Sequence, residues 1–130
     1  MLGVIQISSA YTVSDAVAHA REELRRGLYQ VAVVALLQEE MYGYQLAHIM
    51  EEKGLPIEEG TLYPMLRRLE GQGLLESRWV LGVKRPRKHY IRTEKGQAYL
   101  EGLYPFWQEL SQAVNSLWPA LIPSSDSPAH

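Results

Sequence analysis

The sequence lacks cysteine entirely, and no stretch reaches the roughly 18 consecutive apolar residues that a membrane-spanning helix needs. The absence of cysteine excludes disulfides, thiolate metal sites and thiol nucleophiles, and it is compatible with a reducing compartment. No basic residue precedes the first apolar run, so the sequence predicts no signal peptide. We therefore expect a cytoplasmic protein that does not enter a membrane, with its 130 residues forming one compact domain.

Patterns typical of common enzymes are also lacking. No Gly-x-Ser-x-Gly, Walker or Gly-x-Gly-x-x-Gly pattern occurs. Glu58 and Glu59 are adjacent, so their carboxylates point in different directions, and a solvated turn explains them better than acid–base catalysis. The histidines, which lack the spacing of metal ligands, are His19, His48, His89 and His130. The sequence therefore predicts no catalytic site, no bound metal and no cofactor.

The charges are distributed unevenly along the chain. The net charge is −2, but nine basic side chains outnumber three acidic ones between Arg67 and Lys95. This segment carries +6, which leaves −8 for the rest of the sequence. An acidic protein with one basic third can attract a polyanion to a single face. The alternative is that these charges are scattered over a solvated surface.

Two helices are predicted in the first half of the sequence. Apolar residues recur every three to four positions over residues 17–36, which predicts a long first helix. Thr12 with Asp15 three positions later, or Ser14 alone, is its predicted start. The residues before it, 1–13, form either a loose arm or a short edge strand. A second helix over residues 42–54 is expected to turn Leu46, Ile49 and Met50 inward.

A third helix carries one apolar and one basic face. Thr61 is its predicted N-cap, and Pro64 would then fall in the first turn, where a missing N–H costs little. Leu62, Leu66 and Leu69 lie on one face at spacings of four and three, so this face is expected to pack. The opposite face, which water would reach, carries Pro64, Arg67, Arg68 and Gly71.

The segment after the third helix predicts a β-hairpin with a basic connection. Residues 74–80 and 87–93 have the composition of two strands, and glycines separate them from the preceding helix. Trp79, in the first of these strands, is expected to pack under the sheet.

Thr93 is the predicted N-cap of a long last helix that runs to about Trp118. The Pro- and Ser-rich residues 119–130 are predicted to be a disordered tail. Apolar side chains in the helix follow spacings of 3, 4, 3, 4 and 3, a heptad seam with more apolar surface than a lone domain can cover. The seam predicts a homodimer, and the alternative is that it packs on the chain's own first helix. Its members are Leu100, Leu103, Trp107, Leu110, Val114 and Leu117.

The order helix, helix, helix, hairpin, helix predicts a mainly α fold with a small β-hairpin wing. We expect a winged helix-turn-helix domain over residues 14–92, followed by a dimerisation helix over residues 93–118. In this arrangement the second helix of the pair enters the major groove of DNA, and the hairpin reaches alongside it. A winged helix used only for protein contacts is the alternative.

Three segments resemble the PadR family of bacterial transcriptional regulators. They are YGYQLAHIM, GTLYPMLRRLEGQGLLESRW and RPRKHYIRTEKGQAYL, and the resemblance spans about residues 28–100. It implies a homodimeric DNA-binding repressor that is often released by a small molecule and dimerises through its first and last helices. A two-fold dimer is expected to bind a pseudo-palindromic operator. The N-terminal extension and Pro105 in the last helix depart from the family pattern.

The resemblance implies that Thr61, Tyr63, Pro64 and Arg67 approach DNA. It also implies that Arg87 and Lys88 belong to the wing. A helix N-terminus that presents hydroxyl groups suits a phosphate, and a guanidinium such as that of Arg67 can bond guanine in bidentate fashion. The predicted DNA-binding residues are Thr61, Tyr63, Pro64, Arg67, Arg68, Lys84, Arg85, Arg87 and Lys88.

Aromatic residues crowd the last helix around Pro105, which removes a backbone hydrogen bond and is expected to kink the helix. A bend at an aromatic dimer seam leaves an apolar space that suits a planar hydrophobic or phenolic effector. The predicted pocket residues are Tyr104, Phe106 and Trp107. The alternative is that these rings close-pack as ordinary dimer core and that no effector exists.

Overall fold

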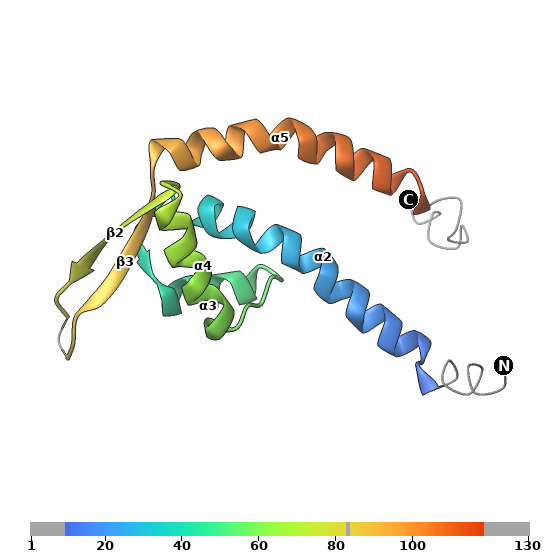
Figure 1. Ribbon diagram of the computed structural model, residues 1–130, viewed down its shortest axis with the longest axis horizontal. Coiled ribbons are helices and arrows are strands. Elements are labelled where there is room, and N and C mark those ends of the chain that lie inside the picture. Colours follow the sequence, from blue (N-terminus) through green and yellow to red (C-terminus); the bar gives the residue numbers. More distant parts are fainter. Residues whose placement is uncertain (1–9, 83, 119–130) are drawn as a thin grey trace.

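The computed structural model describes residues 10–82 and 84–118, so most of the predicted arm and the whole of the predicted tail lie outside it. The elements in chain order are α2 (Val13–Leu36), β1 (Met41–Tyr42), α3 (Gly43–Glu52), α4 (Glu59–Gly71), β2 (Leu75–Val80), β3 (Arg87–Arg92) and α5 (Glu94–Asn115). A helical core lies between a projecting hairpin and two long helices that extend away from it (Figure 1). The predicted fold class, mainly α with a small β wing, is confirmed.

The long first helix starts where a reciprocal pair of hydrogen bonds satisfies its free amides. The Asp15 amide donates to Thr12 Oγ1 and the Thr12 amide donates to Asp15 Oδ2, each at 3.0 Å. Thr12, and not Ser14, is therefore the N-cap. Within α2 only Val33 and Val34 are buried, so the helix joins the core near its C-terminal end and projects from it elsewhere.

Leucines from both helices of the helix-turn-helix fill the core between α2, α3, α4 and the sheet. Leu62, Leu66 and Leu69 are fully buried, which confirms the predicted inner face of α4. Each such leucine contributes about 2 kcal/mol through burial. In α3, Leu46 and Met50 are buried as expected, but Ile49 is only partly covered. The core consists of Val33, Val34, Leu37, Leu46, Met50, Leu62, Met65, Leu66, Leu69, Leu74, Leu75 and Tyr90.

Helix α4 begins earlier than the sequence predicted. Glu58 is the N-cap, and its carbonyl accepts from the amides of Thr61 and Leu62 at 2.9 Å. The prediction that Thr61 caps the helix is therefore wrong. An acidic residue in the first turn, Glu59, complements the helix dipole there. Pro64 consequently lies in the second turn, where its missing N–H leaves the carbonyl four residues earlier without its helical partner.

The wing, which we define as the hairpin of β2 and β3 with its connection, has the predicted antiparallel pairing, from Leu75 opposite Arg92 to Val80 opposite Arg87. The sheet has a third strand that the sequence did not reveal, because β1 is only two residues long and shows no periodicity. It pairs with β3 and gives the order β1-β3-β2. The base of the wing is fixed to the end of α2, where the Arg92 amide donates to the Leu37 carbonyl at 2.7 Å.

The last helix, α5, begins at the predicted cap, since the Gly96 amide donates to Thr93 Oγ1 at 3.0 Å. A side chain at Gly96 would clash with the Leu74 carbonyl, so this glycine allows α5 to pack closely on the turn before β2. The helix continues through Pro105 and follows a gentle curve without a break (Figure 1). Within the described residues, no helix is long and apolar enough to cross a membrane.

Candidate nucleic-acid interface

A groove of about 630 Å³ separates α4 from the wing, and we call it the wing groove. Helix α4 contributes Tyr63 and Arg67 to it, while Tyr42 comes from β1. The remaining lining comes from Gly43, Tyr44, Glu59, Trp79, Arg85, Pro86, Arg87, Lys88 and Tyr90. The predicted recognition helix and the predicted wing thus face each other across one open groove.

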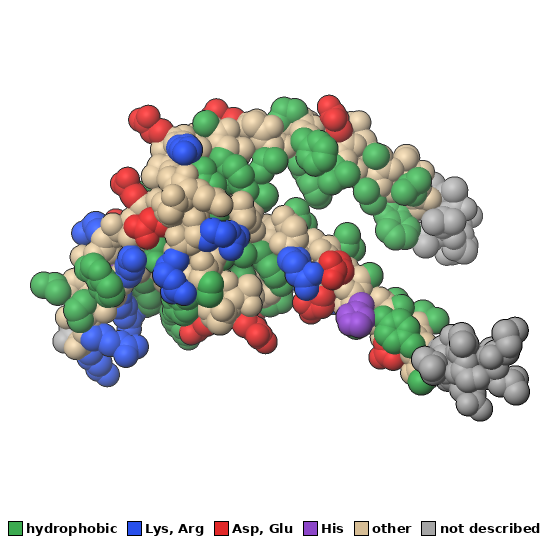
Figure 2. All heavy atoms as spheres, in the orientation of Figure 1, with side chains coloured by type: hydrophobic (Ala, Val, Ile, Leu, Met, Phe, Trp, Pro, Cys, Tyr) green, Lys and Arg blue, Asp and Glu red, His purple; other side chains and the backbone are tan. Residues whose placement is uncertain are grey.

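The wing groove is strongly basic. Four of its lining residues carry a positive charge, and Glu59 carries the single negative one. Among the described residues, no carboxylate lies within ion-pair distance of Arg67, Arg85 or Arg87. Figure 2 shows basic side chains gathered over the wing and the neighbouring part of α4. This uncompensated charge favours an anionic ligand that spans both walls.

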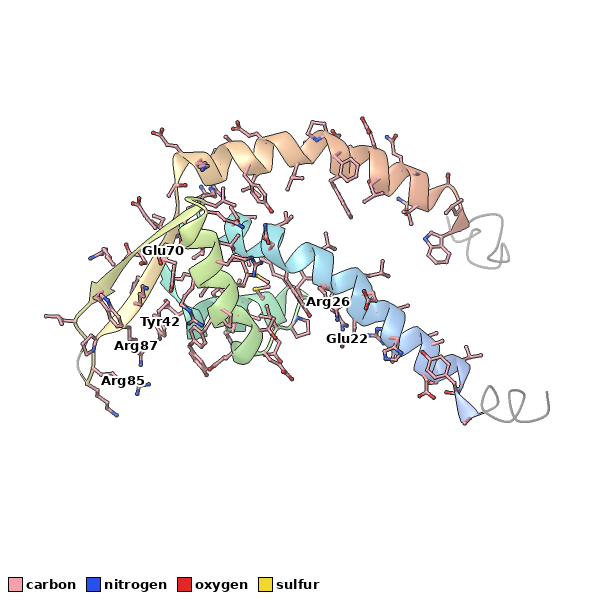
Figure 3. The ribbon with its side chains drawn as sticks, in the orientation of Figure 1. Glu22, Arg26, Tyr42, Glu70, Arg85 and Arg87 are labelled. Carbon is pink, nitrogen blue, oxygen red and sulfur yellow. The ribbon has the colours of Figure 1, made fainter. Side chains whose placement is uncertain are left out.

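Two wing cations are held by aromatic rings. The Arg87 guanidinium lies 4.3 Å from the centre of the Tyr42 ring (Figure 3). Lys88 Nζ lies 5.5 Å from the centre of the Tyr90 ring. Lys88 Nζ also lies 3.6 Å from Glu70 Oε1, while the other carboxylate oxygen, Glu70 Oε2, accepts a 2.6 Å hydrogen bond from the Ser77 hydroxyl. These contacts order the cations, while the guanidinium edge of Arg87 keeps its donors free for an anion.

Tyr63 is positioned by a glycine. A side chain at Gly43 would collide with its ring, so the start of α3 and the second turn of α4 approach closely only because position 43 has no Cβ. Burial raises the pKa of the Tyr63 phenol, the Glu59 carboxylate raises it further, and Arg85 and Arg87 oppose this. The hydroxyl therefore stays protonated near neutral pH and can donate a hydrogen bond into the groove.

Trp79 does not pack under the sheet, so that expectation is wrong. Its side chain is 65% exposed and lines the wing groove, across from Lys88 on the neighbouring strand. Along the same face of β2, Leu75 is buried and Ser77 is half-buried. Burial decreases toward the tip of the wing because the strands move away from α4 there. The alternation of apolar and polar residues in the sequence does not encode the distance between the strands and α4.

Other predicted site residues lie outside this groove. The Arg68 guanidinium donates to Gln30 Oε1 of α2 at 2.9 Å, and Thr61 lines a separate cleft between α2, α3 and the start of α4. That cleft also contains Glu22 and Arg26 (Figure 3). Pro64 and Lys84 are exposed without being part of the wing groove. Of the nine predicted residues, the groove brings together Tyr63, Arg67, Arg85, Arg87 and Lys88.

The family model for the transcriptional regulator PadR-like family matches residues 33–102. This chain belongs to the PadR-like family. A crystal structure of a PadR family transcriptional regulator from Eggerthella lenta matches this chain with a TM-score of 0.77 and 42% sequence identity. The match covers 81% of this chain and 94% of the E. lenta chain. Transcriptional regulator Rv3488 of Mycobacterium tuberculosis is 36% identical over 75 residues, which are 58% of this chain and 70% of Rv3488. The resemblance predicted from the sequence motifs is therefore confirmed.

A third relative was crystallised with DNA. The structure of Bacillus subtilis PadR in complex with operator DNA has a TM-score of 0.53 and 25% identity to this chain. The match covers 58% of this chain and 44% of that one.

The two long helices of this PadR-like chain expose apolar side chains on their projecting parts. Tyr99 and Leu100 pack against the core, so the heptad seam meets the chain's own core only at its start. Leu103 is half-buried, while Trp107, Leu110, Val114 and Leu117 are 41–61% exposed. The predicted pocket residues Tyr104 and Phe106 are also exposed, as are Val13, Val17 and Leu24 of α2. Figure 2 shows open space between the projecting parts of α2 and α5, with hydrophobic side chains on the sides that face it.

Proposed function

We propose that this PadR-like regulator binds duplex DNA through α4 and the wing and acts as a repressor in the cytoplasm. The observation that carries the proposal is the wing groove, whose two walls are lined by three arginines that have no carboxylate partner in the part of the chain that the structure describes. A helix in the major groove and a hairpin beside it is how winged helix-turn-helix proteins engage DNA. The related PadR from B. subtilis, crystallised with operator DNA, supports the same use of the fold here.

The residues divide into two roles. Arg67, on the exposed face of α4, reads a base edge, since a guanidinium can bond the two acceptors of guanine. Arg85, Arg87 and Lys88 bind phosphates, and the protonated Tyr63 hydroxyl adds a neutral donor. Thr61 and Lys84, which are exposed near the same elements, add further phosphate contacts, and the exposed ring of Pro64, which has no donor, packs against the DNA backbone. Arg68 reaches DNA only when it leaves Gln30.

We further propose that the protein is a homodimer. The projecting parts of α2 and α5 carry apolar side chains that are exposed to solvent in a single chain. A second copy would bury them. A two-fold axis between the copies sets two recognition helices against a pseudo-palindrome whose half-sites lie one helical turn, ~34 Å, apart.

An effector site at this dimer seam is the remaining part of the proposal. Tyr104, Phe106 and Trp107 lie on the part of α5 that extends beyond the core, and pairing two copies would bring their rings together. Flat apolar walls suit a planar hydrophobic or phenolic molecule. Such a molecule releases DNA by binding more tightly to the free dimer than to the DNA-bound one.

The DNA-binding proposal is tested with the triple variant Arg67→Ala, Arg85→Ala, Lys88→Ala. Wild-type affinity for random duplex DNA should fall by orders of magnitude between roughly 50 and 200 mM salt, because phosphate contacts release counterions. The variant should bind weakly at every salt concentration. Unchanged DNA affinity in the variant would exclude this interface and favour a winged helix that serves protein contacts.

A further inference from the structure

The exposed indole of Trp79 is the feature of the wing groove that the proposed roles leave unexplained. An aromatic side chain of this size normally gains stability by burial, yet 65% of Trp79 faces water. Its surroundings are cationic, since Lys88 lies opposite it on β3 and Arg67 lines the facing wall. A partner that covers the indole must therefore be apolar at one point and anionic around it.

The sugar-phosphate backbone of DNA has this combination. Each deoxyribose presents an apolar ring edge, and it lies between two phosphates. An indole is suited to both, because its face is apolar and its Nε1–H is a hydrogen-bond donor.

The placement of the groove between two DNA-facing elements identifies the part of the duplex that would enter it. The major and minor grooves of B-DNA are separated by one sugar-phosphate strand. When α4 lies in the major groove and the wing lies in the adjacent minor groove, that strand must pass between them. The space between them is the wing groove, with Tyr63 on one side and Trp79 on the other.

We propose that the wing groove holds one sugar-phosphate strand and that Trp79 packs against a deoxyribose of that strand. The inference rests on the proposed DNA binding. Lys88 and Arg67 hold the flanking phosphates, while the indole covers the sugar between them. Such a contact positions the protein on DNA and carries no sequence information, because every nucleotide has the same sugar.

The test compares Trp79→Ala with Lys88→Ala on two unrelated duplexes over a range of salt concentrations, by fluorescence anisotropy of labelled DNA. Trp79→Ala should lower the affinity for both duplexes by the same factor, about tenfold. The slope of log affinity against log salt should stay at the wild-type value, because an indole releases no counterions. Lys88→Ala should reduce that slope by about one.

Two controls separate a sugar contact from a purely electrostatic effect and from a general loss of apolar surface on the wing. Inorganic polyphosphate offers charge without deoxyribose, so its binding should be the same in wild type and Trp79→Ala. Leu81, which is 84% exposed on the wing but does not line the groove, gives a matched variant, and Leu81→Ala should bind DNA as wild type does. DNA should also quench tryptophan fluorescence in the wild type and much less in Trp79→Phe.

Several results would overturn the inference. These are wild-type affinity in Trp79→Ala, a loss confined to one duplex, an equal loss in Leu81→Ala, or an equal loss of polyphosphate binding. Failure of the proposed function is distinguishable from these, because the wild type itself would then show no salt-dependent binding to either duplex.

Discussion

Arg68 of α4 donates a 2.9 Å hydrogen bond to Gln30 of α2, and the Gln30 amide in turn donates to the Tyr99 hydroxyl of α5 at 3.1 Å. Gln30 and Tyr99 are 69 positions apart in the sequence, and the Gln30 side chain links Tyr99 to Arg68. The chain of bonds joins the predicted recognition helix to both long helices. The side chain of Gln30 thus contacts both α4 and α5.

Replacement of Gln30 by leucine should lower the free energy of unfolding by about 1–2 kcal/mol, because two hydrogen bonds of ordinary strength are lost. Tyr99→Phe removes only the second bond and should cost about 0.5–1 kcal/mol. Urea denaturation followed by circular dichroism measures both values. Equal stability of wild type and Gln30→Leu would show that the two hydrogen bonds of Gln30 do not stabilise the fold.

Arg67→Ala should reduce affinity for the preferred DNA site by about 1–3 kcal/mol and relax the preference at one base pair. Arg85→Ala should lower the affinity for all DNA sequences alike, since it removes a phosphate contact. It should also reduce the slope of log affinity against log salt by about one. Binding to a library of duplexes with single-base changes distinguishes these effects. Arg26→Ala is a suitable control, because Arg26 lies on α2, paired with Glu23 and away from the wing groove.

Glu70→Gln should strengthen DNA binding a few-fold, in contrast to the other substitutions. The carboxylate lies 3.6 Å from Lys88 Nζ, and its removal frees this ammonium group and deletes a negative charge beside the groove. Both side chains are about one-third exposed, so the lost ion pair should cost less than about 1 kcal/mol of stability. The amide can still accept the Ser77 hydrogen bond. Weaker DNA binding in this variant would mean that Glu70 holds Lys88 in its binding position.

The double variant Leu110→Glu, Leu117→Glu should sediment as a monomer at micromolar concentration. It places two charges in the apolar seam of α5, where a second copy would have to desolvate them. Gln108→Glu, Gln112→Glu adds the same charges to the same helix outside the heptad seam and should leave the dimer intact. A dimer that survives the leucine substitutions would move the interface elsewhere.

Titration with a panel of planar phenolic compounds should quench tryptophan fluorescence in the wild type. The same compounds should release the wild-type protein from DNA. The response should vanish in Trp107→Phe, because that indole lies at the proposed pocket, while Trp79 and Trp118 still report on the rest of the protein. No response across the panel would leave the aromatic residues of α5 as dimer core alone.

The sequence by itself determined most features that depend on near neighbours in the chain, although it placed the cap of α4 at Thr61 instead of Glu58. The cap at Thr12 needs only Asp15, and the inner face formed by Leu62, Leu66 and Leu69 follows from helical spacing. The hairpin follows from alternation in the same way. These signals act over about four residues, and their order along the sequence predicted the winged helix-turn-helix fold.

Tertiary structure alone decided which of the predicted residues meet. The pairing of Met41 with Tyr90, the exposure of Trp79 and the hydrogen bond from Arg68 to Gln30 each depend on contacts or distances between segments remote in sequence. Packing of Gly43 on Tyr63 sets how closely α3 and α4 approach. No local period encodes such distances, because they result from how all the elements share one core. The basic composition was therefore evident from the sequence, but the groove that gathers part of it was not.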